Sequence, residues 1–150
     1  MKKNLDEVDR KILKILQKNS RTPLREISKK VGLVNSAVHV RIKKLKKRGI
    51  IKKFTVILNP EGLNLPLLAF VLIKASKGKY QEIAEELVKY PEILEVYEII
   101  GKYDIILKVR TRNIKELDSL LNEVGDINGI KEISTGIVLK IQKTTTELPL

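Results

Sequence analysis

The sequence has no cysteine, and its 150 residues include a single histidine, His39. Without cysteine there can be no disulfide framework, no thiolate zinc site and no cysteine nucleophile. A lone imidazole has no partner for metal binding or proton transfer. The chain also lacks a glycine-rich phosphate loop and any paired carboxylates in a setting suited to general acid–base chemistry. We therefore expect no catalytic residue, no metal ligand and no cofactor, and the protein is not expected to be an enzyme.

Long apolar runs and aromatic side chains are also scarce. No run approaches the roughly 18 apolar residues of a membrane span, and the N-terminus turns acidic where a signal peptide needs its apolar core. We expect a cytoplasmic protein with no membrane partner. Of six aromatic residues, only Phe70 and Tyr97 fall in predicted strands of the C-terminal half. RNA-binding sheets stack bases on aromatic side chains, so this scarcity argues against an RNA-binding module.

Acidic residues are few in the first two-fifths of the chain. Residues 1–60 hold eighteen Lys and Arg against four Asp and Glu, a balance of +14, whereas residues 61–150 stand at −2. Such segregation predicts a polyanion-binding module joined to a nearly neutral one. A thermophile's charged surface is the alternative interpretation, but it accounts for the charge content and not for its distribution.

Two short helices are predicted in the basic part of the chain. Asp6 can cap the first, which reads EVDRKILKILQK. For the second, Thr22 is expected at the N-cap, Pro23 at the first helical position and Gly32 just past the C-terminal end. Both segments repeat apolar residues at helical spacing, and these are expected to face a common core: Val8, Ile12, Ile15, Leu16, Leu24, Ile27 and Val31.

A third helix is predicted within residues 32–49, GLVNSAVHVRIKKLKKRG, which contain six basic residues and no acidic one. Val38, Ile42 and Leu45 lie at helical spacing and anchor one side in a core. Two helices joined by a tight turn, the second of them cationic outside, form a helix-turn-helix, which places the start of its second helix in the major groove of DNA. The alternative for a lysine-rich helix is a face that is merely solvated.

This motif predicts double-stranded DNA as a partner. The expected base contacts are Asn35, Ser36, His39 and Val40, with Asn35 suited to adenine and Val40 to a thymine methyl. After the helix, the segment IIKKFTVILNP is predicted to be a strand and a candidate wing that ends at Pro60. The expected phosphate contacts are Arg21, Thr22, Lys43, Lys44, Lys47, Lys52 and Lys53.

Gly62 and Pro66 mark a linker. We therefore expect a DNA-binding domain at 1–50, a strand or wing with the linker at 51–66, and a second domain at 67–150. Within the second domain the pattern predicts strands at about 67–75, 94–100, 105–110 and 132–142, with helices at about 79–89 and 113–124. The order βαββαβ is that of a ferredoxin-like domain of the α+β class, with both helices on one face of an antiparallel sheet.

The first of these strands, LLAFVLI, is apolar on both faces. Leu68, Phe70 and Leu72 point to one face, and the residues between them, which are also apolar, point to the other. A half-exposed strand should instead alternate apolar with polar residues. Because the helices can cover only one face, the other is expected to pack on a second subunit. This predicts a homodimer that forms through the C-terminal sheet. A strand that is wholly internal in the monomer is the alternative.

The motifs, in this order, resemble those of the Lrp/AsnC family of feast/famine transcriptional regulators. The resemblance is carried by LDEVDRKILKILQKNSRTP, by LREISKKVGLVNSAVHVRIKKLKKRGIIKKF and by EVYEIIGKYDIILKVRT, while the ending KTTTELPL is similar to archaeal members. It implies a winged helix-turn-helix followed by a ferredoxin-like RAM domain, named for the regulation of amino-acid metabolism. It also implies dimers that often assemble into octamers, and an amino-acid effector bound between RAM domains of neighbouring dimers.

The resemblance also implies an effector site. The turn GKYD lies at the family's Gly-x-Tyr/x-Asp position, and STGIV lies at its Thr-rich strand. The carboxylate of Asp104 suits the ammonium of an amino acid, and the hydroxyl of Thr135 suits its carboxylate. The alternative is a tight hairpin in which glycine permits the turn and Asp104 bonds its own backbone. The residues carried over as effector contacts are Tyr97, Gly101, Tyr103, Asp104, Ser134, Thr135 and Gly136.

Three positions depart from the family's pattern. Val34 stands where a serine usually caps the recognition helix, which makes Asn35 a candidate for the cap. Lys102 replaces a common acidic residue of the turn and Ile100 a frequent small or hydroxyl residue, and both bear on which amino acid is accepted. The predicted function is a sequence-specific transcriptional regulator whose assembly or DNA affinity responds to an amino acid. The alternative is an effector-independent architectural DNA-binding protein.

Overall fold

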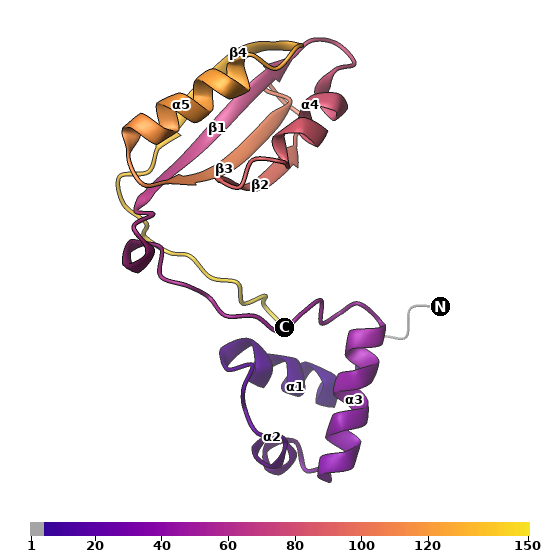
Figure 1. The fold of residues 1–150 in the computed structure, drawn as a ribbon. Helices are drawn as coiled ribbons and strands as arrows, with labels where there is room; N and C mark the ends of the chain where they lie inside the picture. The colour runs from indigo at the N-terminus through magenta and orange to yellow at the C-terminus, as the bar shows by residue number, and fades with distance from the viewer. Residues whose placement is uncertain (1–4) are drawn as a thin grey trace. The chain divides into compact units, whose positions relative to one another are not determined.

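The computed structural model describes residues 5–150, which divide into two compact units (Figure 1). One unit is helical, runs to Ile57 and includes the segment Lys143–Leu150. The other, Leu58–Gln142, contains a four-stranded sheet and two longer helices, with a single 3₁₀ turn at Glu61–Leu63 before them. The predicted α+β class is confirmed.

Three helices form the first unit: α1 (Glu7–Lys18), α2 (Leu24–Val31) and α3 (Asn35–Lys47). α1 begins at Asp6, whose Oδ1 accepts a hydrogen bond from the backbone N–H of Asp9 at 2.7 Å. α2 ends at Gly32, where φ is 69°, a left-handed conformation that a residue with a Cβ disfavours. The predicted cap of α1 and the predicted end of α2 are both confirmed.

The three helices share one core because each carries an apolar stripe. Ile12 of α1, Ile27 of α2 and Val38 and Leu45 of α3 are at most 1% exposed. Ile42, predicted to anchor the same side of α3, is partly buried against this cluster. Burial of one stripe on each helix fixes which side of α3 faces solvent.

The end of the chain also packs on the helical unit. The amide Nε2 of Gln17 donates to the carbonyl of Leu148 at 3.1 Å, and the N–H of Leu148 donates to Gln17 Oε1 at 2.7 Å. Leu150 is partly buried against the helical core. This return could not be predicted from the sequence, because a short irregular segment carries no periodic pattern.

Two predictions about helix caps are wrong by one residue. Pro23, not Thr22, is the cap residue of α2. The hydroxyl of Thr22 donates to the carbonyl of Asn19 at 2.7 Å instead of accepting from a helical N–H. Val34 is the cap residue of α3 and provides no side-chain hydrogen bond, so Asn35 is the first helical residue and not the cap.

The strand predicted after α3 is also wrong, because residues 50–59 have no regular secondary structure. Val56 and Ile57 are 73% and 78% exposed. A β-branched run becomes a strand only when a neighbouring strand pairs with its backbone, and the described strands pair with one another instead. Phe54 of this segment lies under the ammonium of Lys46, 5.7 Å from its ring centroid.

The second unit has the predicted order βαββαβ. Its strands are all antiparallel to their neighbours, in the spatial order β2-β3-β1-β4. The last strand was predicted at 132–142 but ends at Ile137, because β1, its only neighbour, begins at Leu67 and the carbonyl of Leu68 accepts its last bond from Val138. The elements are β1 (Leu67–Ala75), α4 (Tyr80–Leu87), β2 (Ile93–Glu98), β3 (Ile105–Thr111), α5 (Ile114–Gly125) and β4 (Ile130–Ile137).

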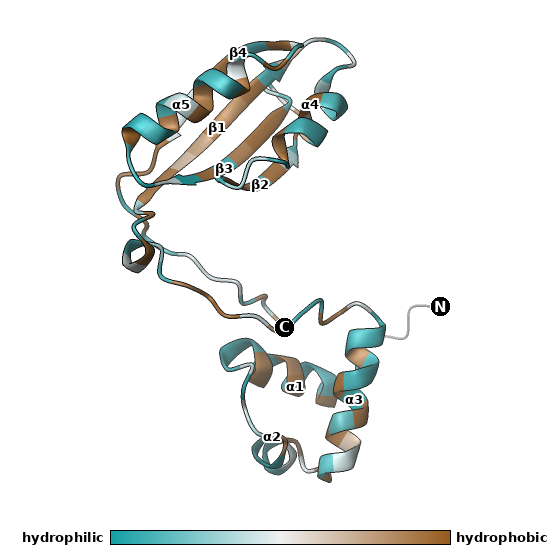
Figure 2. Cartoon of the chain, viewed as in Figure 1, coloured by the Kyte–Doolittle hydropathy of each residue, from teal (hydrophilic) through white to brown (hydrophobic). Residues whose placement is uncertain are grey.

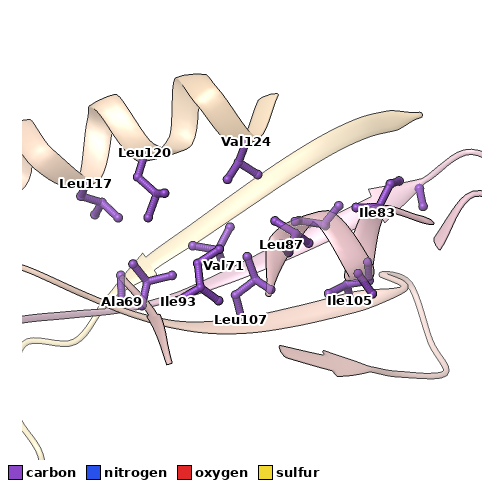
Figure 3. Close-up of a cluster of buried hydrophobic side chains, with 14 residues drawn as sticks. Ala69, Val71, Ile83, Leu87, Ile93, Ile105, Leu107, Leu117, Leu120 and Val124 are labelled. Atoms are coloured by element: carbon purple, nitrogen blue, oxygen red, sulfur yellow. The ribbon is translucent and has the colours of Figure 1, made fainter. Parts of the chain in front are cut away.

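One face of the sheet is buried under both helices. β1 is hydrophobic along most of its length, whereas α4 and α5 are hydrophilic on the side away from the sheet (Figure 2). Leu87 of α4 and Leu120 of α5 lie over Val71 and Leu107 (Figure 3), which are at most 1% exposed. This core therefore takes alternate residues of each strand.

The other alternate residues form the outer face of the sheet. The strand register places Tyr97, Ile106, Leu72 and Ser134 in one row and Glu95, Lys108, Phe70 and Gly136 in the next. Phe70 is 38% exposed, so β1 is not wholly internal in the single chain. The prediction that the helices cover only one of its two apolar faces is confirmed.

None of the helices in the described part of the chain is long and apolar enough to cross a bilayer.

Candidate nucleic-acid interface and effector site

α3 presents a narrow polar stripe on the side away from the core. At about 100° of rotation per residue, Ser36, Val40, Lys43 and Lys47 fall within about 60° of one another and opposite Val38. All four are exposed, and Val40 is 47% exposed despite being apolar. The helix contains no acidic residue, and Lys43 and Lys47 make the C-terminal half of this stripe cationic.

A groove of about 900 Å³ runs beside this stripe. It brings two of the predicted base contacts together with two of the predicted phosphate contacts, and the acidic start of α1 forms its other wall. Its lining includes Ser36, Val40, Lys44, Lys47, Asp6 and Asp9. The third predicted base contact, His39, is exposed on the flank of α3.

Asn35, the fourth predicted base contact, is engaged within the protein. Its Oδ1 accepts a hydrogen bond from the hydroxyl of Ser28 at 2.6 Å, and Ser28 is 7% exposed on α2. The bond ties the first residue of α3 to α2 and leaves the Asn35 amide group as a donor. The sequence could not show this contact, because the two residues belong to different helices.

The remaining predicted phosphate contacts lie outside α3. Arg21 and Thr22 precede α2, where the N–H of Arg21 donates to Asn19 Oδ1 at 2.9 Å. Lys52 and Lys53 are exposed in the irregular segment that follows α3.

Arg41 differs from the other basic residues of α3. Its Nη1 donates to Asp6 Oδ2 at 2.6 Å and to Asp9 Oδ1 at 2.8 Å. The N–H of Asp9 and the guanidinium hold the pKa of Asp6 below its usual value, and the two carboxylates raise the pKa of Arg41. Sequence reasoning counted Arg41 only as a positive charge. Two features of the sequence could have indicated the ion pairs. Helical spacing places Arg41 beside the buried stripe of α3, and two acidic residues lie at the start of α1.

Within residues 5–150, no three His, Asp or Glu side chains come together in a group that could hold a metal ion.

In the second unit, Asp104 anchors the turn between β2 and β3 to the end of β1. Its Oδ2 accepts from the N–H of Ala75 at 2.8 Å and its Oδ1 from the Lys74 ammonium at 3.2 Å. Its own N–H donates to the carbonyl of Ile73 at 2.9 Å. The N–H of Ala75, followed by Lys74, holds the pKa of Asp104 below its usual value. Both carboxylate oxygens are thus occupied by a structural role.

Tyr103 extends the same turn towards β4. Its hydroxyl donates to Glu132 Oε1 at 2.8 Å, and the ammonium of Lys102 lies 5.1 Å from its ring centroid. A Cβ added at Gly101 would meet no atom within 4 Å, so crowding does not require glycine there. Asp104, Tyr103 and Gly101 therefore lie together at one end of the sheet.

The other predicted effector residues are spread over the sheet. Tyr97 on β2 and Ser134 on β4 share a row but are separated by β3 and β1, a span of about 14 Å at the usual strand spacing. Thr135 pairs with Val71 and so points to the helix side, opposite to Ser134. Gly136 lies in the neighbouring row of the outer face, beside Phe70. The single chain does not gather these residues into one pocket.

Tyr97 is held by a charged neighbour. Its hydroxyl donates to Glu95 Oε2 at 2.8 Å, and Lys108 donates to Glu95 Oε1 at 2.9 Å. The bond from Lys108, and then that from Tyr97, lowers the pKa of Glu95, while Glu95 raises the pKa of Tyr97. The outer face is therefore apolar at its centre, with an ion pair at the β2 edge.

Two family models match the chain, one over each unit. Residues 5–52 match the winged helix-turn-helix DNA-binding family, and residues 68–148 match the Lrp/AsnC ligand binding domain. Over 150 residues the chain is 56% identical to the HTH-type transcriptional regulator FL11 of Pyrococcus abyssi, covering 100% of this chain and 99% of that protein.

Solved structures share the whole fold. Escherichia coli AsnC superimposes with a TM-score of 0.92 at 32% identity, covering 97% of this chain and 99% of that one. A transcriptional regulator of Neisseria meningitidis, solved as a complex with L-Met, also gives a TM-score of 0.92 at 32% identity, covering 97% of both chains.

Replacing Asp104 by Asn should lower the free energy of unfolding at pH 7 and flatten its fall in acid. Because the pKa of Asp104 is lower in the folded chain, the ionised carboxylate stabilises the fold above the unfolded pKa, and this contribution is lost as the pH falls through the folded pKa. Urea unfolding at pH 7 and near pH 3 measures both effects. Asp118→Asn, at an exposed position of α5, is the control and should change neither. A gap between wild type and Asp104→Asn that stays constant with pH would contradict the assignment.

Proposed function

The chain belongs to the Lrp/AsnC family of transcriptional regulators, and from that premise we propose that it reads a specific DNA sequence and responds to an amino acid. Like the other members of this family, it is a DNA-binding regulator and not an enzyme. The finer proposal has three parts: how α3 meets DNA, how two chains associate, and where the effector binds. As a DNA-binding regulator it is proposed to act in the cytoplasm.

The observation that carries the DNA proposal is the acid-free stripe of α3, which is exposed opposite the core. We assign α3 as the recognition helix. Ser36 and Val40, at the N-terminal end of the stripe, are placed to meet base edges, Val40 through a thymine methyl. His39 and the amide group of Asn35 flank them as further base contacts. The lysines of the stripe, with Arg21, Thr22, Lys52 and Lys53, are proposed to contact phosphates, which position the helix without reading sequence.

Duplex binding should weaken steeply with salt. Each phosphate neutralised by a lysine releases counterions, so the logarithm of the binding constant falls by about 0.9 per log unit of salt for each contact. We expect Lys43→Gln to reduce this slope by about 0.9 and Lys77→Gln, an exposed lysine of the second unit, to leave it unchanged. Fluorescence anisotropy over a salt series measures both. A wild-type affinity that does not depend on salt would rule out the proposed interface.

We propose that two chains associate through the outer face of the sheet. Phe70 and Leu72 are apolar and lie on a face that none of the described helices covers. The small residues Ser134 and Gly136 beside them leave room for the side chains of a partner. A dimer places two recognition helices on one duplex, and a spacing near 34 Å, one helical turn, would suit a pseudo-palindromic site. Assembly of dimers into an octamer is a further part of this proposal.

A charge at the centre of this face should weaken association. Phe70→Glu would bury a carboxylate between two sheets, next to a Lys108 whose ammonium is already bonded to Glu95, so we expect the dissociation constant of the dimer to rise at least tenfold. Val88→Glu provides the control, because Val88, the C-cap residue of α4, is 64% exposed and lies outside that face. Sedimentation equilibrium measures the constant for each protein. Equal constants for wild type and Phe70→Glu would exclude the outer face as the interface.

The proposed effector is an amino acid bound between neighbouring C-terminal units. The Neisseria regulator in complex with L-Met supports this class of ligand. In this chain the effector candidates do not share one pocket, and Asp104 is already bonded on both oxygens. A site between chains would let residues from two copies meet, with the hydroxyl of Ser134 or Thr135 as a donor to the carboxylate. The bonding of Asp104 also favours the second candidate function, an architectural protein that needs no effector.

An amino-acid screen by thermal unfolding separates the two functions. A ligand that binds only the folded protein stabilises it by about 2.7 kcal/mol at 100 times its dissociation constant. We expect one or more amino acids to raise the unfolding temperature and to change duplex affinity, and Ser134→Ala to reduce the shift. Lys77→Gln, at an exposed position of the second unit, is the surface control and should keep the shift. If no amino acid shifts unfolding or duplex binding, the architectural function replaces the regulated one.

A further inference from the structure

We infer that Arg41 is a positioning residue of the recognition helix and not one of its phosphate contacts. Tied to Asp6 and Asp9 of α1, it fixes the rotation of α3 about its own axis and thereby the register in which Ser36 and Val40 meet bases. The inference rests on the proposed DNA-reading function and adds to it the device that sets sequence discrimination.

The first support is the placement of the polar links on α3. At about 100° of rotation per residue, Asn35 and Arg41 lie about 60° to either side of Val38. Val38 is the most deeply buried residue of α3. Asn35 bonds Ser28 of α2, and Arg41 bonds Asp6 and Asp9 at the start of α1. Rolling α3 in one direction stretches the first link and rolling it in the other direction stretches the second.

The second support is that apolar burial sets which side of α3 faces the core, but does not set the fine angle of rotation about the helix axis. Hydrophobic contact is non-directional, and Val34, the N-cap residue of α3, provides no side-chain hydrogen bond that would fix the first turn. Hydrogen bonds of 2.6 and 2.8 Å from one guanidinium to two carboxylates are directional and charge-assisted. They act on the half of the helix that carries the base contacts.

The third support is the burial of Asp9. This residue is 8% exposed, and a carboxylate taken that far out of water needs a paired cation. The side chain of Arg41 is 32% exposed and supplies that cation. Arg41 is therefore committed to α1, whereas Lys43, Lys44 and Lys47 form no ion pair with any residue in the described range.

The fourth support is the local charge. Two carboxylates surround one guanidinium, which leaves a net negative charge on the wall of the groove beside α3. The side chain of Asp6 is 51% exposed there, so a phosphate brought to Arg41 would meet a carboxylate of like charge. Lys44 and Lys47 also line the groove but form no ion pair within the described residues, so a phosphate brought to them meets no such penalty.

Two variants that each remove one positive charge from the same helix test this assignment. Arg41→Gln and Lys43→Gln are compared on a duplex that the wild type selects from a random-sequence pool, and on the unselected pool. We expect Lys43→Gln to weaken binding to both duplexes alike and to reduce the salt slope by about 0.9. We expect Arg41→Gln to keep the wild-type slope but to lower the ratio of the two affinities at least tenfold.

The acidic partners provide variants that keep α1 capped. Asp6→Asn retains a cap acceptor and removes one carboxylate from the groove wall, so it should lower the affinity ratio while strengthening binding to the unselected pool. Because the side chain of Asp6 is exposed, Asp6→Asn should fold even if Arg41→Gln does not. Thermal unfolding of each variant shows whether it is folded. A loss of salt slope in Arg41→Gln equal to that in Lys43→Gln, or an unchanged affinity ratio in Asp6→Asn, overturns the inference alone. A wild type without salt-dependent duplex binding overturns the proposed function and the inference with it.

Discussion

The burial of Val38 and Leu45 against Ile12 and Ile27 is the contact on which the DNA-binding surface depends. Once these side chains face inward, the geometry of an α-helix leaves Ser36, Val40 and the lysines of α3 no position except the outside. The basic charge of the segment is then tolerable, because the like charges face water, or phosphates, and not a core. The same apolar stripe would serve a helix with any outer face, so the identity of the exposed residues is free to serve recognition.

The second unit applies the same rule to a sheet. Alternate residues of β1 and β3 pack under α4 and α5, and the remaining residues of β1 form a second, only partly exposed apolar face. A strand that is apolar on both sides in a sheet with helices on one side creates a surface that is costly to leave in water. Asp104 and Tyr103 hold the turn between β2 and β3 against the ends of β1 and β4. The groups that bind the turn to the sheet are thus among those first assigned to the effector.

Where periodicity is strong, the sequence was a good guide. The three helices of the first unit and the order βαββαβ follow from apolar spacing. The start of α1 and the end of α2 are correct because Asp6 and Gly32 act through their own backbone or the nearest turn. Prediction failed where a partner decides the outcome. Residues 50–59 have the composition of a strand but no strand to pair with, and β4 stops where β1 begins. Thr22 failed as a cap for a smaller reason, since its hydroxyl bonds the preceding turn instead.

The sequence by itself determined the segregation of charge, the helix-turn-helix pattern, the two-faced apolar strand and the family to which the chain belongs. The first three are read from composition and from spacing along one segment, and the family from the resemblance of several motifs that occur in order along the chain. The tertiary structure decided what each polar side chain does: that Asn35 bonds Ser28, that Arg41 is held by Asp6 and Asp9, that Asp104 bonds Ala75, and that Leu148 returns to Gln17. Hydrogen bonds and ion pairs depend on distances of a few ångströms between residues far apart in the chain, and only the packed fold sets those distances.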